Sequence, residues 1–427
     1  MVRRQRPRRK INFTKLKQLL NKFKSLPQNN QFQKIKDYLT QESTFILGLL
    51  ILLICISLIA TSLFWRGIHV FEGNLTTDQI SFIYADKQDK LFINSIRRIK
   101  KFELQSQQTV TLKGKFSSKS DPKINQLQKI TVKLTDAKSK FIIEPSEPKK
   151  ASEIVLSEIR IQPNTEINHL SYNSYGDTLS FCLDKGNNPE KLCLQTDTHS
   201  IDAAKSSQSK ATKLAKLNLE IGSQPLKVNL EGYSIAELGK PENSNPIEFI
   251  FTPQSSEYEF DLTPPTTLYI NLPKVTPEVF SQWFRGKSAV ENVRFTQSDR
   301  TGNVEDDLEI STILEGKVRM AEQELELKAN QFLITGKPGI EFLAKIGVRS
   351  QPPQGLQVRF SGRSEGIEIG LDPNFIVDSI RPSFLAKYLT KDAISALISF
   401  CGGVAGALLP LLLAAKSDED SNNANSS

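Results

Sequence analysis

Two uninterrupted apolar runs lie near the ends of the sequence, and the long stretch between them is hydrophilic. The first run covers residues 45–65 and the second covers residues 393–415, and neither contains a charged residue. A helix rises about 1.5 Å per residue, so about 20 apolar residues are enough to cross a hydrocarbon layer about 30 Å thick. Backbone polar groups can be satisfied in lipid only within a helix or a closed barrel. The pattern therefore predicts two transmembrane helices.

Each run has another interpretation. The first could be a cleaved signal peptide, but a typical signal core is about 7–15 residues long and lies close to the N-terminus. Here the run begins only after 44 residues. The second could be a buried core helix, but Lys391, Lys416 and Tyr388 flank it as charged and interfacial residues flank a membrane span. Retained membrane anchors are the interpretation we favour for both runs.

Between the runs, short segments alternate between apolar and polar residues and are separated by Gly, Pro, Asn and Asp. Period-two alternation with such turns indicates antiparallel sandwiches or barrels, and the connections are too short for crossover helices. One helix is expected at 277–285, with Thr276 as its N-cap and Pro277 in its first turn. The predicted fold is mainly β, an antiparallel β-sandwich or jellyroll-like region between two transmembrane helices. The predicted strands lie at 109–116, 129–134, 153–161, 178–183, 226–233, 248–252, 266–272, 307–314, 324–334, 356–362 and 366–371.

These patterns divide the chain into predicted segments. A polar stretch, AAKSSQSKATK, is the best candidate for a linker inside the β region, and a further boundary is considered near residue 286. The segments are a basic cytoplasmic tail with an amphipathic helix (1–44), a transmembrane helix (45–65), an extracytoplasmic β domain (66–202), the linker (203–213), a second extracytoplasmic β region (214–391), a transmembrane helix (393–415) and a disordered cytoplasmic tail (416–427).

Basic residues are concentrated before the first run. Residues 1–44 carry 12 Lys and Arg and two acidic residues, whereas residues 66–392 carry 42 of each sign and residues 416–427 are acidic. The positive-inside rule then predicts that both termini are cytoplasmic and that the central region is not. Three basic residues on the outer side of the second run, Arg381, Lys387 and Lys391, oppose this orientation. We expect the larger charge of the N-terminal tail to determine the orientation. The expected location is a bacterial inner or plasma membrane.

The N-terminal tail has the pattern of a basic amphipathic helix. Apolar residues at 13, 16, 20 and 23 share one helical face, and Pro27 ends the pattern. Such a helix can lie against the anionic headgroups of a membrane. The alternative is a solvated tail without a partner, and nucleic-acid binding is not expected because no aromatic interleaving accompanies the arginines. The predicted membrane-surface residues are Arg3, Arg4, Arg6, Arg8, Arg9, Lys15, Lys17, Lys22 and Lys24.

Two of the four cysteines lie close together in the segment FCLDKGNNPEKLCL. We predict a hairpin there that turns at residues 187–188, with Cys182 opposite Cys193 and Asp184 opposite Lys191. Directly opposed strand residues lie at a separation that a disulfide can bridge, and the bond forms outside the cytoplasm. The sequence therefore predicts a disulfide on the polar face of a hairpin. Two free thiols are the alternative if the turn is shifted.

The sequence contains no complete catalytic or metal-binding motif. Its three histidines are unpaired, and no Cys-x-x-Cys is present, so we expect no metal or cofactor. The segment GRSEG around Ser364 matches the nucleophile elbow, which requires a helix after the serine and a later histidine. Here a predicted strand follows, and no histidine lies beyond His199. We therefore predict a turn and no enzyme activity, although a paired-carboxylate hydrolase stays open as the third hypothesis.

The second apolar run carries a stripe of small residues at helical spacing. Small stripes let helices approach closely in lipid. The partner could be the first run of the same chain, a second copy, or another membrane or envelope protein. Ordinary small-residue content without pairing is the alternative. The stripe consists of Ser395, Ser399, Gly402, Gly403, Gly406 and Ala407.

Residues 314–334, LEGKVRMAEQELELKANQFLI, resemble the strand pairs of the β-jellyroll domains that shuttle lipopolysaccharide across the periplasm. The resemblance covers 21 residues and implies a lipid-handling role. Our leading hypothesis is a two-span, non-enzymatic scaffold or assembly factor that presents a large β domain in a membrane or envelope complex. The alternative is an envelope transport component whose β domain binds a lipid or a glycan.

Overall fold

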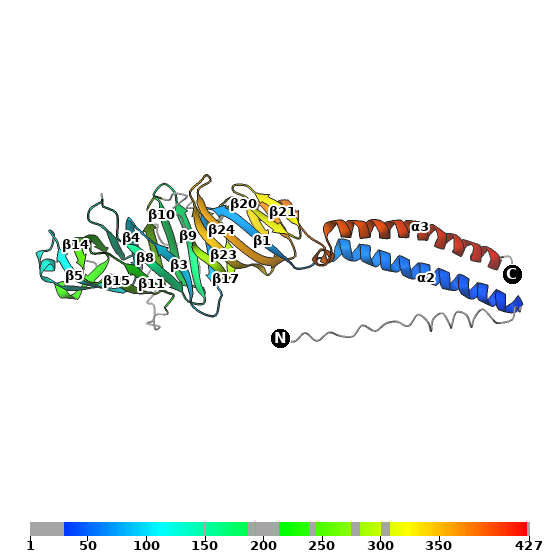
Figure 1. Ribbon diagram of the computed structural model, residues 1–427, viewed down its shortest axis with the longest axis horizontal. Coiled ribbons are helices and arrows are strands. Elements are labelled where there is room, and N and C mark those ends of the chain that lie inside the picture. The colour runs from blue at the N-terminus through cyan, green and yellow to red at the C-terminus, as the bar shows by residue number, and fades with distance from the viewer. Residues whose placement is uncertain are drawn as a thin grey trace, which may run out of the picture. The chain divides into compact units, whose positions relative to one another are not determined.

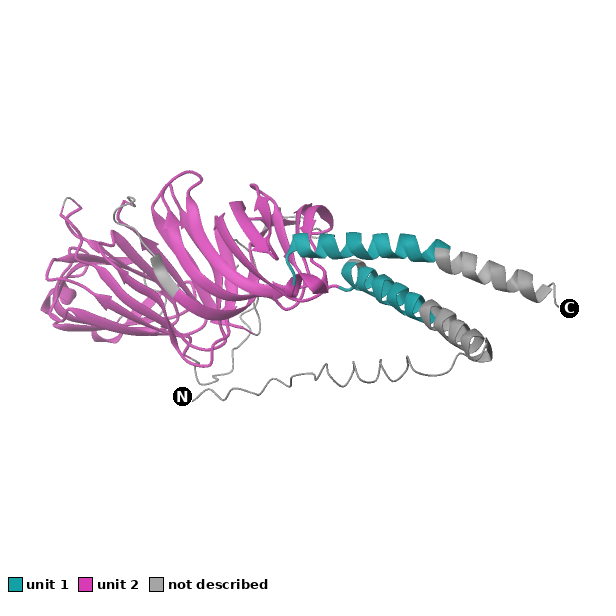
Figure 2. Ribbon diagram, turned by 45° about the vertical axis from the view of Figure 1, so that its right-hand side comes forward, with its two compact units in different colours: residues 1–65, 389–427 teal, residues 66–388 magenta. Residues whose placement is uncertain are grey.

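The computed structural model describes residues 30–148, 150–186, 193, 213–239, 245–274, 282–299 and 308–424. The chain forms two compact units, which Figure 2 distinguishes by colour. Unit 1 combines the two ends of the chain, Met1–Trp65 and Leu389–Ser427, and unit 2 is Arg66–Tyr388.

Unit 1 contains the helices α2 (Asn30–Phe64) and α3 (Lys391–Ala424), which pack against each other. Among the α2 residues whose side chains are described, Leu52, Cys55 and Ser62 are buried, with spacings of three and seven residues that place them on one face. Cys401 is the buried residue of α3 among those whose side chains are described. The apolar positions of α3 on the side of Cys401 are half-buried, at Ile394, Leu397, Ile398, Val404 and Leu408. This spacing of three and four residues is that of helices packed along a narrow seam.

The two apolar runs differ in length within these helices. In α3, Lys391–Pro410 is long and apolar enough to cross a membrane. In α2, the described apolar part, Ile46–Ser62, is shorter than a full span. The helices also extend beyond the runs, since α2 begins at Asn30 and α3 continues to Ala424. The tail expected to be disordered from residue 416 is therefore helical as far as Ala424, which agrees with the good helix formers Ala414, Ala415 and Lys416.

Unit 2 is built from antiparallel sheets, as the alternating pattern predicted. Its largest sheet has 17 strands, each hydrogen-bonded to the next (Figure 1). In spatial order these strands are β21 (Gln323–Leu327), β20 (Ile313–Met320), β1 (His69–Thr77), β24 (Gly355–Ser364), β23 (Gly339–Arg349), β17 (Gln282–Arg294), β2 (Gln79–Tyr84), β9 (Thr165–Asn173), β10 (Thr178–Lys185), β16 (Thr266–Asn271), β4 (Lys101–Ser106), β7 (Lys140–Pro145), β12 (Leu226–Glu231), β14 (Ile247–Pro253), β5 (Thr109–Ser117), β6 (Lys129–Leu134) and β13 (Tyr233–Ile235).

Three smaller sheets and three short 3-10 helices complete unit 2. A four-stranded sheet packs on the large one, with Phe92 against Phe181 at a ring-centroid separation of 5.9 Å and Phe141 near Phe260 at 6.3 Å. These remaining elements are β3 (Lys90–Ile96), β8 (Val155–Ile161), β11 (Ala215–Glu220) and β15 (Glu257–Leu262) in the four-stranded sheet; β22 (Phe332–Thr335), β25 (Ile367–Asp372) and β26 (Phe375–Ile380) in a three-stranded sheet; β18 (Thr296–Asp299) and β19 (Leu308–Ser311) in a pair; and the helices η1 (Pro122–Gln126), η2 (Ala236–Leu238) and η3 (Phe384–Lys387).

One apolar core runs through unit 2 because strands bury every second side chain. On β24, for example, Leu356, Val358 and Phe360 are buried while Gln357 and Arg359 point to the other face. Burial of apolar area at about 25 cal/mol per Å² is the main force that holds such sheets together.

The structure changes two expectations about organisation. The helix predicted at 277–285 is wrong over its last residues, because β17 begins at Gln282; residues 275–281 lie outside the described part of the chain. Strand pairing of this part of β17 with β23 overrides the local helix signal. In addition, β8 and β11 pair although they lie on either side of the predicted linker at 203–213. The two predicted β segments thus share sheets within one compact unit.

Candidate functional site

The candidate site lies on the solvent face of five neighbouring strands of unit 2, which are β23, β24, β1, β20 and β21. On β1, the side chains of Val70, Glu72 and Asn74 are exposed, while Phe71, Gly73 and Leu75 face the core. Strand β20 repeats this alternation, with Lys317 and Arg319 exposed between buried positions. Because neighbouring strands are in register, the outward side chains form rows across the sheet.

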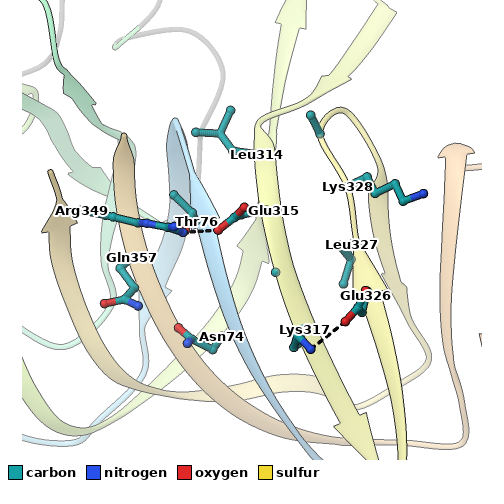
Figure 3. A pocket seen from close by; sticks show the side chains of 12 residues that line it. Asn74, Thr76, Leu314, Glu315, Lys317, Glu326, Leu327, Lys328, Arg349 and Gln357 are labelled. Carbon is teal, nitrogen blue, oxygen red and sulfur yellow. Dashed lines mark hydrogen bonds and ion pairs between the residues drawn. The ribbon is translucent and has the colours of Figure 1, made fainter. Parts of the chain in front are cut away.

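Two hollows indent this face. The larger, about 610 Å³, lies over β1, β20 and β21 and also reaches Arg349 and Gln357 (Figure 3). The second, about 500 Å³, extends from Val70 past Glu72 to Glu324. The two hollows share Asn74 and Lys317 in their linings. We call them together the polar groove.

Ion pairs and hydrogen bonds organise the side chains of the polar groove. Lys317 donates to Glu324 over 3.1 Å and pairs with Glu326 at 2.7 Å, and Figure 3 shows Lys317 and Glu326 facing each other. Arg359 donates to Glu72 over 3.2 Å. These contacts place oppositely charged side chains on adjacent strands, which stabilises the register.

Arg349 closes one end of the larger hollow. Its guanidinium donates to the Thr76 hydroxyl over 3.1 Å and to Glu315, and Figure 3 shows these three residues together. It also donates to the Pro352 carbonyl over 3.2 Å. Three acceptors hold the planar group in a fixed orientation. Beside it, the Gln357 amide oxygen accepts from Lys345 over 2.9 Å.

The floor of the polar groove is held close to the core by two glycines. A Cβ added to Gly73 would lie 2.2 Å from the ring of Phe360, and one added to Gly316 would lie 2.2 Å from Leu75. Both distances are far below van der Waals contact. Any larger residue at either position would push β1 and β20 apart from the core beneath the groove.

Ion pairing stabilises the charged forms of Lys317 and Glu326 in the groove. Hydrogen bonds to Glu326 and Glu324 raise the pKa of Lys317, and the same lysine lowers the pKa of Glu326. The groove is lined by residues of both charges. It contains five basic residues (Lys317, Arg319, Lys328, Arg349, Arg359) and five acidic ones (Glu72, Glu315, Glu322, Glu324, Glu326), so its net charge is zero.

The predicted disulfide is present. Cys182 and Cys193 are bonded, with their Cα atoms 6.1 Å apart. The predicted environment is wrong, however, because the bond does not join two strands of a hairpin. Both edges of β10 are occupied: Cys182 is opposite Thr267 of β16 and Asn168 of β9. Cys182 is also 3% exposed rather than on an open polar face.

Beside Cys182 lies a buried polar group that sequence reasoning missed. Glu166 and Asp184 are directly opposite each other on β9 and β10, and both are almost fully buried. Arg294 donates to one oxygen of Glu166 over 3.1 Å, but Glu166 Oε2 and Asp184 Oδ2 have no hydrogen-bond partner among the described residues. Burial raises the pKa of both carboxyls. The sequence carried no signal for this, because it does not show that the polar face of β10 is covered.

The predicted helix stripe faces away from α2. Ser395, Ser399, Gly402, Gly403, Gly406 and Ala407 are all exposed, whereas Cys401 on the opposite side of α3 is buried. A Cβ added to Gly402, Gly403 or Gly406 would meet no atom within 4 Å. The predicted membrane-surface residues, from Arg3 to Lys24, lie outside the described part of the chain.

Ser364 is fully buried at the end of β24, and its hydroxyl is engaged within its own turn. It donates to the Gly366 carbonyl over 2.5 Å and accepts from the Gly366 amide over 3.2 Å. The fold brings His69 directly opposite Ser364 in the strand register, which the sequence order did not suggest. The His69 ring, however, bonds through Nε2 to the Ser383 carbonyl at 3.1 Å, so that nitrogen is a donor and not a base. Burial, opposed by this hydrogen bond, lowers the pKa of His69, which keeps the ring neutral.

Within the described ranges, no group of three or more His, Cys, Asp or Glu side chains is arranged to hold a metal ion. The sequence matches no protein-family model, and no curated protein is significantly similar to it.

Proposed function

We propose that this protein is a two-span scaffold or assembly factor of a bacterial inner or plasma membrane, with a non-enzymatic β unit outside the cytoplasm. Its long apolar helix α3, the apolar part of α2 and the basic N-terminal tail support the membrane assignment. The Cys182–Cys193 bond supports placement of unit 2 in an oxidising compartment. The basic residues before Pro27 would then contact anionic headgroups on the cytoplasmic side.

The observation that carries the proposal is the outward direction of the small-residue stripe. Helix α2 packs on the side of α3 that contains Cys401, so the intramolecular contact leaves Gly403 and Gly406 uncovered. In lipid, close backbone approach and van der Waals contact drive helix association, and small residues permit both. The stripe is thus suited to a helix of another membrane protein or of a second copy.

The proposal is tested by replacing Gly403 and Gly406 together with Ile. Two branched side chains would separate the helices without reducing the apolar character needed for insertion. We expect normal membrane levels but loss of a detergent-stable complex, measured by native electrophoresis and mass spectrometry after affinity capture.

The matched control is Leu409→Ile, an isomeric change at an apolar residue of α3 that is 50% exposed. This variant should keep the complex. An unchanged complex in the double Ile variant would remove the stripe from the interface and leave the scaffold proposal without its main support.

A further inference from the structure

We propose that the polar groove binds a neutral glycan chain. This inference concerns unit 2 alone and goes beyond the scaffold function proposed from the helices. It rests on the charge, hydrogen-bonding groups and length of the groove.

Charge excludes two classes of ligand. The five basic and five acidic residues of the lining cancel, so the groove offers no net attraction to an anionic polymer. Their charged ends would also be costly to cover with a lipid chain, because buried charges lose hydration. A neutral polar ligand avoids both costs and can accept from Arg and Lys while donating to Glu.

Unused hydrogen-bonding groups line the polar groove, one of them where the two hollows meet. Among the described residues, the Asn74 amide has no partner, although it is part of both linings. The Gln357 nitrogen is likewise free of described partners, since only its oxygen is bonded to Lys345. Side-chain amides offer a donor and an acceptor side by side, which matches adjacent hydroxyls of a sugar ring.

Apolar side chains among these polar groups can contact the C–H faces of sugar rings. Val70 is 65% exposed at one end, and the half-buried Leu314 lines the larger hollow. Ligand sites typically combine such apolar surface with a few fixed polar groups. The Arg349 contacts described above supply the fixed groups at the other end.

The length of the polar groove indicates a chain rather than a single sugar. Its β1 residues extend from Val70 to Thr76, which is about 20 Å at 3.3 Å per residue. A peptide strand could not pair with β1 along the groove, because both edges of β1 are already paired, with β20 and β24. The proposed ligand is a linear chain of neutral hexoses, which can be either free or joined to a lipid.

The test uses the full chain in nanodiscs, because maltoside detergents carry a sugar headgroup that would compete. Maltoheptaose, cellohexaose, laminarihexaose and mannohexaose are titrated by calorimetry, with an oligogalacturonate as the anionic comparison. A second arm extracts lipids from the purified protein and analyses them for attached neutral sugars. Asn74→Leu fills the point where the hollows meet. Arg363→Gln is the matched control, since it breaks the Arg363–Glu341 pair on the same face but outside both hollows.

We expect saturable binding of at least one neutral oligosaccharide, at least tenfold weaker in Asn74→Leu and unchanged in Arg363→Gln. Sugar-bearing lipid that copurifies with the wild type and is lost in Asn74→Leu would identify the lipid-joined source. Failure of all four neutral chains to bind, together with no copurified sugar, would overturn the proposal. Tighter, salt-sensitive binding of oligogalacturonate, or equal binding by Asn74→Leu, would overturn it as well.

Discussion

Removal of the Cys182–Cys193 bond should destabilise unit 2 by an amount that the loop length determines. The two residues are 11 apart in the sequence, so the bond closes a loop of about a dozen residues. In the chain-entropy treatment, this restricts the unfolded state by about 3 kcal/mol at 25 °C. The Cys182→Ala/Cys193→Ala double variant should therefore lose about 3 kcal/mol of free energy of unfolding, and each single variant should lose nearly as much.

The assay is urea unfolding of the full chain in detergent, followed by circular dichroism of the β signal. Because Cys182 is buried, its replacement by Ala also removes packing, and wild-type protein reduced with a thiol separates this effect. Reduced wild type keeps both sulfur atoms and loses only the cross-link. Variants of Cys55 and Cys401, which lie in the helices of unit 1, serve as matched controls and should leave the β transition unchanged.

A loss below about 1 kcal/mol in both the double variant and the reduced wild type would refute the loop-entropy argument. Alkylation offers a separate check on the compartment. If both thiols react freely in protein from intact membranes, the bond is absent in the cell, and the placement of unit 2 outside the cytoplasm loses its support.

Three further predictions concern charge, topology and chemistry. Burial raises the pKa of Asp184 above 3.8, so its ionised form is unfavourable in the folded state and stability should rise as pH falls through the raised pKa. Asp184→Asn should thus add about 1–2 kcal/mol at neutral pH and remove this pH dependence; lower stability in a denaturation series at neutral pH would contradict it. Reporter fusions that work only outside the cytoplasm should be active near residue 300 and silent at residue 427, and activity at residue 427 would refute the orientation. Ser364→Ala should leave the detergent-stable complex intact, because the Ser364 hydroxyl is bonded within its own turn; loss of the complex would contradict this purely local role.

The sequence by itself determined the class of the fold and the chemistry of its covalent bond. Period-two alternation on segments such as 356–362 specifies a half-buried strand whatever its neighbours are, because the side-chain period is a property of the extended backbone. The apolar runs likewise indicated a helix near each end of the sequence, although both helices extend beyond the runs. The two cysteines were identified as partners because they are close in sequence.

Only the tertiary structure decided which strands are neighbours. Residues 69–77 pair with 313–320 and 355–364, and nothing local to β1 indicates partners so far away in the chain. For this reason the polar groove, the opposition of Glu166 and Asp184, and the covered setting of Cys182 were not predictable: each requires strands that are distant in sequence. The same cause converted part of a predicted helix into β17, since pairing with the distant strand β23 outweighs a local preference worth only about 1 kcal/mol.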